Sequence, residues 1–222
     1  MSTKYLFHVV CLLAVMTFVP TTVVAERPAE QLVGTFEMSF YWMSLQSDFD
    51  DAEDTAIYDK QCTAIATVPA KFAQRMTVEG TGKLSDGRVL NTAGACECGY
   101  SPCFFQVPRR TQWGLGVKNR ALSPFRSIAV DHDVVPIGTR LYIPELDGLR
   151  MPGKAPWGGF VHDGCVIADD RGGAVRGNEI DFFAGHRAYY RVLQRKHRFD
   201  SVTAYDGAER CKTFREGSPN QV

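Results

Sequence analysis

The second half of the sequence is a succession of short apolar runs, each bounded by turn residues. The clearest of these runs are 127–130, 139–143, 160–161, 165–168 and 180–183. Short runs rich in β-branched and aromatic residues are typical of strands, and the Gly and Pro residues between them mark turns. Apolar residues recur at helical spacing only in 69–76 and 186–196. Many short strands and two helices indicate a mainly β protein, built as a closed barrel.

The first half contains fewer clear elements. Residues 34–45 are aromatic and partly alternating, which predicts a strand with one buried face. The acidic segment 46–60 is expected to be an exposed loop. Asp86-Gly87 lies between two apolar runs and indicates a hairpin over 84–90, because this pair readily takes the positive φ angles of a tight turn. The cysteine-rich segment 94–105 has no clear period and is interpreted as a stapled loop.

Size and charge narrow the class of protein. A chain of 222 residues suits one domain with long loops, and no stretch has the composition of a linker. The formal net charge is zero. Nucleic-acid binders usually carry a basic excess, so the charge argues against a nucleic-acid partner.

The N-terminus has the features of an export signal. Lys4 is followed by an almost wholly apolar stretch from residue 6 to 19, and Val23-Val24-Ala25 suits cleavage after Ala25. The alternative is a membrane anchor, but the apolar stretch is shorter than the ~20 residues needed to span a bilayer. We therefore expect residues 1–25 to be a signal peptide. The mature protein would be periplasmic, outer-membrane-associated or extracellular, with no stable membrane insertion.

The cysteines fit an oxidising compartment. Of the seven, Cys11 lies in the apolar stretch and six remain after it. An even number in an exported chain favours disulfides, with the pairing left open. The alternative is a zinc site at Cys96, Cys98 and Cys103, whose spacing lacks the paired C-x2-C units of structural zinc sites.

Three aspartates stand beside turn residues at the ends of predicted strands: Asp131, Asp170 and Asp181. Aspartate is a poor strand former, so three such cases suggest carboxylates gathered at one face of a barrel. Taken singly, each is better explained as a turn cap, because aspartate binds backbone N–H groups well.

The surrounding motifs resemble a known family. The segments SIAVDHDVVPIGTRLYIPEL and CVIADDRGGAVRGNEIDFF are similar to the 3D domain, named for its three aspartates. This domain is shared by the membrane-bound lytic transglycosylase A family and by wall-associated Firmicute proteins. The part of the chain that matches well is about a quarter of its length. The upstream segments GTGKLSDGRVLNTAG and QWGLGV extend the resemblance loosely.

The resemblance implies a six-stranded double-psi β-barrel with short helices and an N-terminal extension. Residues 26–105 would form the N-terminal part of the barrel domain with the cysteine-rich loop, 106–200 the 3D domain, and 201–222 a C-terminal tail. The protein would be a monomer that cleaves peptidoglycan glycan strands. Two rival functions remain: a glycoside hydrolase on the same barrel, and a wall-glycan-binding module without catalysis.

By the same resemblance Asp181 is the catalytic acid, and Asp131 and Asp170 orient the site. A lytic transglycosylase needs one principal carboxyl group, which protonates the departing oxygen and then takes the proton of the C6 hydroxyl. Such an acid must hold its proton near neutral pH. We predict that the pKa of Asp181 is raised, by apolar cover from Phe182 and Phe183 and by the charges of Asp131 and Asp170.

The chain departs from the family pattern at one position, where Arg171 replaces the usual threonine after Asp170. Its guanidinium could pair with Asp170 or Asp169, bind a glycan acetamido oxygen or a peptide carboxylate, or point to solvent. Gly172 and Gly173, which follow, are expected to serve a turn that needs positive φ or close backbone approach.

Aromatic residues are the remaining candidates for substrate contact. Tyr41 and Trp42 lie in a stretch resembling an early strand of the family and could stack on sugar rings; core packing is the alternative. His132, His162, Asp163 and the three aspartates form no recognised ligand spacing. We therefore expect neither a metal nor another cofactor.

Overall fold

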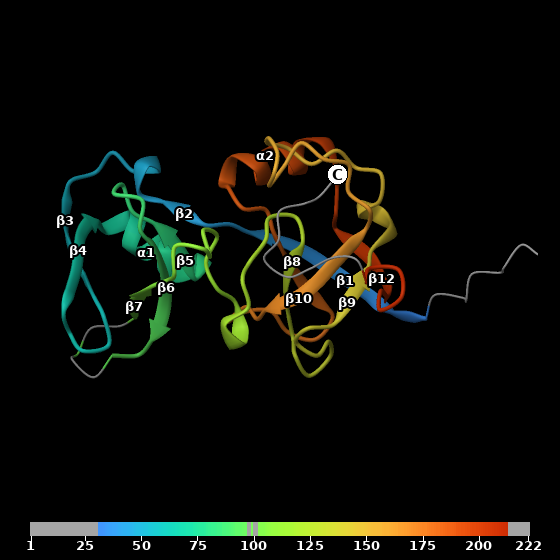
Figure 1. Cartoon of the computed structure of the whole chain (residues 1–222), viewed down its shortest axis with the longest axis horizontal. Helices are drawn as coiled ribbons and strands as arrows, with labels where there is room; N and C mark the ends of the chain where they lie inside the picture. The colour runs from blue at the N-terminus through green and yellow to red at the C-terminus, as the bar shows by residue number, and fades with distance from the viewer. Residues whose placement is uncertain (1–30, 97–98, 100–101, 213–222) are drawn as a thin grey trace, which may run out of the picture.

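The chain folds into two lobes, a closed ring of six strands and a smaller β-rich lobe beside it (Figure 1). The computed structural model describes residues 31–96, 99 and 102–212. The predicted export signal, residues 1–25, lies outside these residues. Within the described part, no helix combines the length and the apolar character needed to cross a membrane.

The ring is a single closed sheet. In order around it, the strands are β1 (Leu32–Tyr41), β11 (Glu179–Phe183), β8 (Ser127–Val130), β10 (Cys165–Asp170), β9 (Arg140–Tyr142) and β12 (Ser201–Asp206). The pairs β1–β11 and β8–β10 are parallel and the others antiparallel. The ring closes because β12 pairs with both β9 and β1. This strand lies in the range expected to be a C-terminal tail, so the chain is structured further than the sequence predicts.

The inside of the ring is the main hydrophobic core. Phe36 and Met38 of β1 are buried there, and Phe40 packs against the same core, as the two-residue period of a strand requires. Phe182 of β11 and Ile128 of β8 fill the centre and are fully buried. The alternation seen in the aromatic segment is therefore that of a strand with one face in the core.

The second lobe has its own core. It contains a four-stranded sheet in the order β2 (Ser44–Leu45), β5 (Thr81–Lys83), β6 (Val89–Gly94) and β7 (Cys103–Gln106), and a hairpin of β3 (Glu53–Tyr58) and β4 (Ala64–Pro69). Phe72, Met76 and Leu90 are at its centre. The expectation of a loop over 46–60 is wrong where β3 lies, because these residues pair with β4 and Ile57 is buried in this core.

Both expected helices are present. Helix α1 (Ala70–Glu79) begins directly after Pro69 and buries Phe72 and Met76, which are one turn apart. Gly80 ends it with a φ of 77°, a conformation that glycine adopts without strain. Helix α2 (Arg187–Lys196) lies beside the ring (Figure 1). Short 3-10 turns complete the structure: η1 (Gln46–Asp48), η2 (Val117–Asn119) and η3 (Pro144–Leu146).

Apolar side chains from both lobes meet in a third cluster, which we call the seam cluster. Tyr41, Ala129 and Phe183 come from the ring, whereas Val89 comes from the second lobe. Met43, on the short connection between β1 and β2, packs among them, and its N–H donates to the carbonyl of Gly185 at 2.9 Å. Burial of this shared surface holds the two lobes in one arrangement. The sequence does not reveal the division, because no linker separates the lobes.

Two disulfides join described cysteines. Cys96 pairs with Cys103 in the second lobe, and Cys165 of β10 pairs with Cys211 beyond β12. The preference for disulfides over zinc is confirmed for Cys96 and Cys103, because their sulfurs are bonded to each other. These bonds indicate an oxidising compartment.

Candidate functional site

Asp181 lies in the middle of β11, between two small neighbours. It is paired in register with Ser39 of β1 on one side and with Ala129 of β8 on the other. Ser39 Oγ donates a hydrogen bond to Asp181 Oδ1 at 3.0 Å. Among the described residues, no donor reaches Asp181 Oδ2. The strand therefore presents a half-buried carboxyl group with one oxygen fixed and the other unengaged.

Asp170 ends β10, on the far side of β8. It too is in register with Ala129, after a shift in the β10–β8 pairing between Ala168 and Asp170. Irregularities of this kind re-aim side chains and are common beside functional sites. Tyr41 Oη donates to Asp170 Oδ2 at 3.3 Å, and the N–H of Arg171 donates to Oδ1 at 2.8 Å. Both oxygens of this carboxyl group are thus engaged.

The two carboxyl groups are unusually hard to ionise. Burial raises the pKa of Asp181 to about 6, the charge of Glu179 adds to the rise, and the Ser39 hydrogen bond opposes it. Burial also raises the pKa of Asp170 to about 7, against the hydrogen bonds from Arg171 and Tyr41, with Asp169 and Asp181 adding like charge. The prediction of a raised pKa for Asp181 agrees with this direction.

The predicted causes of that shift need correction. Phe182 points into the ring core, away from Asp181, because successive residues of a strand face opposite sides. Phe183 shares the face of Asp181 and lies against Tyr41, with ring centroids 4.9 Å apart. Glu179, rather than Asp131 or Asp170, is the carboxylate that raises the pKa of Asp181.

Asp170 and Asp181 line one groove between the two lobes, with a volume of about 370 Å³. The ring contributes these aspartates, Tyr41 and Ala129 to its wall. The second lobe contributes the end of α1 and the start of β5, including Glu79. Of the two predicted aromatic contacts, Tyr41 lines the groove but is buried. Trp42 is not part of the lining; its ring stacks on Tyr190 of α2 at 5.0 Å.

The structure does not bring Asp131 into this groove. Its Oδ2 accepts from the N–H of Gly177 at 2.8 Å and its Oδ1 from the N–H of Asp133 at 3.1 Å. These bonds, the Gly177 bond first, lower the pKa of Asp131. Asp131 therefore has the contacts of a turn-capping aspartate, and it joins two loops at the end of the ring.

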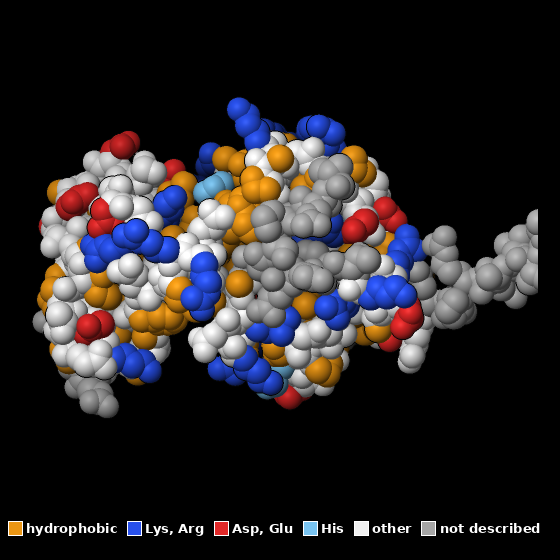
Figure 2. Space-filling view, viewed as in Figure 1, with side chains coloured by type: hydrophobic (Ala, Val, Ile, Leu, Met, Phe, Trp, Pro, Cys, Tyr) orange, Lys and Arg blue, Asp and Glu red, His pale blue; other side chains and the backbone are white. Residues whose placement is uncertain are grey.

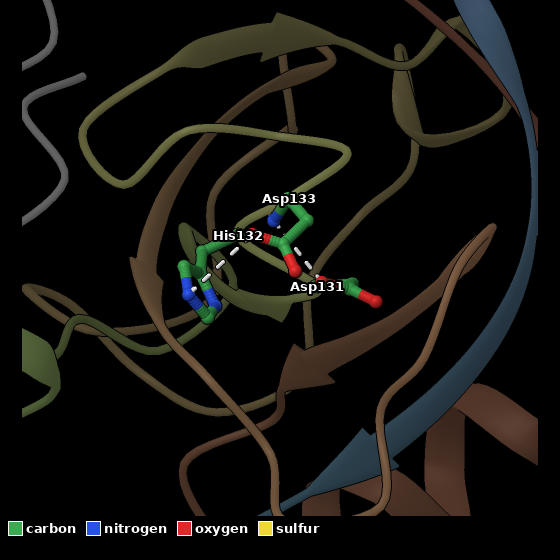
Figure 3. Close-up of side chains that lie close together, drawn as sticks. All are labelled: Asp131, His132 and Asp133. Atoms are coloured by element: carbon green, nitrogen blue, oxygen red, sulfur yellow. Dashed lines mark hydrogen bonds and ion pairs between the residues drawn. The ribbon is translucent and has the colours of Figure 1, made fainter.

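Asp131 lies with His132 and Asp133 at one turn, where their potential ligand atoms are within 4.8 Å of one another (Figure 3). His132 and Asp133 are exposed, and both oxygens of Asp131 accept backbone hydrogen bonds. We assign no metal to this turn. The buried His162 is also accounted for, because its Nε2 donates to the carbonyl of Phe125 and its Nδ1 accepts from Gly164 N–H.

The loop that follows Asp170, residues 171–178, separates the groove from a second pocket of about 500 Å³. We call it the Arg171 loop. Arg171, Gly172 and Gly173 line both hollows. A Cβ on Gly172 would lie 2.4 Å from Val175 Cγ2, so a larger residue there would displace that side chain, whereas Gly173 has open space around it. Neither glycine has a positive φ, and the close contact at Gly172 is with a side chain, so the expected reason for the two glycines is not found.

The guanidinium of Arg171 is exposed, and among the described residues no carboxylate pairs with it. Asp169 is fully buried and is bound instead by Arg120 Nε and Ser127 Oγ, each at 2.7 Å. Asp170 is bound by Tyr41 and by the main chain of Arg171. Of the alternatives for Arg171, pairing with either neighbouring aspartate is therefore absent from the structure.

Sequence reasoning missed one carboxyl group in the groove. Glu79 is the last residue of α1, and its side chain is only 5% exposed. Its Oε2 accepts from the N–H of Trp42 at 3.1 Å and its Oε1 from Arg75 Nη1 at 3.4 Å. Burial raises the pKa of Glu79 to about 7. A glutamate at the end of an amphipathic helix carries no local signal of this placement, which depends on how the lobes meet.

Comparisons with known proteins identify a domain family and solved structures with a similar fold. Residues 126–193 match the model of the 3D domain. The structure of E. coli MltA with bound chitohexaose is similar, with a TM-score of 0.51 and 15% identity over 78% of this chain and 71% of that one. No curated protein matches the sequence.

Two further solved structures are similar at lower scores. A membrane-bound lytic murein transglycosylase from Agrobacterium tumefaciens gives a TM-score of 0.48 and 13% identity over 82% and 76% of the two chains. The lytic transglycosylase LtgG of Burkholderia pseudomallei gives 0.43 and 16% over 77% and 70%. The chain therefore contains a 3D domain at residues 126–193 and has an MltA-like fold, at low sequence identity.

Proposed function

We propose that this protein is a lytic transglycosylase that cleaves the MurNAc–GlcNAc bond of peptidoglycan, with Asp181 as acid and then base. The observation that carries the proposal is the unengaged Oδ2 of Asp181. Three carboxyl groups with raised pKa line the groove, and in Asp170 and Glu79 both oxygens accept hydrogen bonds. Asp181 is the one of the three with an oxygen available to exchange a proton with a ligand.

The reaction needs only that oxygen. Protonated Asp181 gives its proton to the glycosidic oxygen as the C1–O bond breaks. The resulting carboxylate then takes the proton of the C6 hydroxyl, whose oxygen bonds to C1 and closes a 1,6-anhydro ring. The proton taken up in the second step replaces the one given in the first, so no water is consumed. A pKa of about 6 suits both steps near neutral pH.

The fold supports the substrate class. The MltA structure with bound chitohexaose shows that a protein of this fold binds a glycan chain. We further propose that the ring is the double-psi barrel of the 3D family, since two parallel pairs in an otherwise antiparallel ring fit that topology. Its working place would be the exported, wall-facing side of the cell, in agreement with the disulfides. Figure 2 shows Lys and Arg as well as Asp and Glu on both lobes.

The test is digestion of purified sacculi followed by mass analysis of the products. We expect anhydro-muramic ends, no release by Asp181→Asn, and full release by the matched control Asp200→Asn, an exposed aspartate outside the groove. Reducing ends would instead indicate a glycoside hydrolase with Asp170 as its second carboxyl group. Binding without soluble fragments would indicate a glycan-binding module.

A further inference from the structure

The Arg171 loop carries a feature that the cleavage reaction does not use. Its first residue presents a cation at the shared edge of the groove and the second pocket. The main-chain N–H of Arg171 donates to Asp170 Oδ1, so the Arg171 side chain starts directly beside Asp170, in the wall of the groove. The guanidinium itself is exposed and has no carboxylate partner in the described part of the chain.

The loop that holds this cation is fixed by its own contacts. Arg176 donates to the carbonyls of Val175 at 2.6 Å and Gly173 at 2.9 Å. Asp131 Oδ2 accepts from Gly177 N–H at 2.8 Å. The guanidinium of Arg176 is therefore occupied by the loop, whereas that of Arg171 remains available. A cation on a preorganised loop binds a ligand without the cost of ordering the backbone.

The acids around the second pocket do not neutralise Arg171. Asp131 is committed to two backbone N–H groups, and Asp133 is exposed and lies 3.7 Å from His132 Nε2. The second pocket also has the volume for more than a single small ion, at about 500 Å³. It shares Arg171, Gly172 and Gly173 with the groove.

The chemistry of the proposed substrate indicates which of its groups the Arg171 guanidinium would bind. Sugar rings of a wall glycan are uncharged, and the lactyl group of muramic acid is amidated by the peptide. The negative charges of the strand are the carboxylates of the stem peptide. The muramic sugar whose bond is cut also carries a peptide at C3, so that peptide leaves the groove within one sugar of Asp181. A guanidinium binds a carboxylate with two parallel hydrogen bonds.

From this arrangement we propose that Arg171 and the second pocket form a binding site for a stem-peptide carboxylate, which makes the enzyme prefer strands with free peptide carboxylates. This inference rests on the proposed function for its substrate. It concerns this chain's own residue, because the related pattern has threonine at the position. Arg171 is a specificity residue that acts outside the reacting atoms.

The test compares two matched substrates: peptide-bearing glycan strands, and the same strands after carbodiimide-mediated amidation of their carboxylates. Arg171→Gln is expected to raise KM for the untreated strands about fivefold, the size of an exposed ion pair, and to leave kcat unchanged. On amidated strands Arg171→Gln and the wild type should have the same KM. Arg171→Lys should recover part of the loss, and added salt should reduce the difference.

The control is Arg187→Gln, an exposed arginine on α2 that lines neither hollow. It should leave KM unchanged on both substrates. An equal effect of Arg171→Gln on both substrates, or no effect on either, would overturn the inference.

A binding measurement separates this inference from the proposed function. In the Asp181→Asn background, Arg171→Gln should weaken binding of peptide-bearing strands and leave binding of chitohexaose unchanged. If the wild type releases no anhydro product but this selective loss is found, the proposed reaction is wrong and the carboxylate site stands. If cleavage occurs and the two ligands lose affinity equally, the carboxylate site is wrong and the reaction stands.

Discussion

Ser39 Oγ donates a hydrogen bond to Asp181 Oδ1 across the β1–β11 pair, where the two residues are directly opposite in register. The bond fixes the carboxyl group and also stabilises its charged form. It therefore opposes burial, which raises the pKa of Asp181 to about 6. A neighbouring strand thus adjusts the protonation of the proposed acid through one hydroxyl group.

Removal of that hydroxyl should change the pH dependence of cleavage. The proposed acid acts when protonated, so the rate should fall as pH rises through the pKa of Asp181. Ser39→Ala removes a bond to the carboxylate, so this pKa should rise and the alkaline limb of kcat/KM should move up by about 1 pH unit. The measurement is a pH–rate profile, with Ser201→Ala, an exposed serine of β12, as control. An unmoved or acid-shifted limb would contradict the assignment.

Asp170 should lower the stability of the protein at neutral and alkaline pH. Its pKa in the folded state is about 7, above the ordinary 3.8. The folded protein therefore binds this proton more tightly than the unfolded chain, and the stabilisation is lost as pH rises through about 7. Asp170→Asn removes the charge. The difference in free energy of unfolding, Asp170→Asn minus wild type, should be about 1–3 kcal/mol more positive at pH 8 than at pH 4, so the variant is relatively more stable at the higher pH.

Chemical denaturation at the two pH values measures this difference. Lost hydrogen bonds from Tyr41 and Arg171 affect both pH values, so the comparison between them isolates the charge. Asp200→Asn provides the control and should show no such pH-dependent gain. A constant effect of Asp170→Asn at both values would mean that the carboxyl group is not buried as the structure has it.

Asp131 should behave in the opposite way. Backbone N–H groups lower its pKa, so its contribution to stability is present above the ordinary 3.8 and is lost as pH falls through the lower folded-state value. Asp131→Asn should be less stable than the wild type at pH 7, and the difference should shrink in acid. Denaturation at pH 7 and pH 3 measures this.

Cleavage activity provides a second test of the role of Asp131. Because it holds the Arg171 loop and lies outside the groove, Asp131→Asn should still form anhydro ends, at a rate about ten- to a hundredfold lower from misplacement of that loop. Asp181→Asn should form none. Complete loss in Asp131→Asn, with the fold retained, would give Asp131 a direct role in the chemistry.

The two disulfides should differ in their effect on stability. Cys165 and Cys211 are 46 residues apart in sequence, whereas Cys96 and Cys103 are 7 apart. Replacement of each pair by alanine should cost about 4 kcal/mol for the first and about 2 kcal/mol for the second in the chain-entropy model. Unfolding of the two double variants under the same conditions compares them directly. An equal or reversed order would show that native-state packing, rather than loop closure, sets the contribution.

Local patterns in the sequence were sufficient for much of the fold. The two-residue period of β1, the Phe72 and Met76 spacing of α1, and the Asp86-Gly87 turn are each determined by neighbours in sequence. Strand β3 was missed because it begins with the acidic pair Glu53-Asp54 and Ile57 is its one buried residue. The second lobe was missed because its separation depends on contacts distant in sequence.

The candidate site was predictable only in part. Asp170 and Asp181 meet in the groove as the three-aspartate pattern suggests. Asp131 has the same local sequence setting, but its backbone partners, Gly177 and Asp133, make it a cap. Glu79 enters the site from the other lobe, and nothing in its local sequence indicates that. Sequence patterns therefore located the strand ends and left the direction of each carboxyl group open.

The seam cluster has a consequence for how far the groove can open. Val89, Phe183 and Met43 pack in one cluster, so spreading the lobes would expose them at a cost of about 25 cal/mol per Å² of apolar surface. We therefore expect the groove to keep its width when a ligand binds. If a glycan strand binds there as proposed, the sugar chain rather than the protein has to adjust its shape.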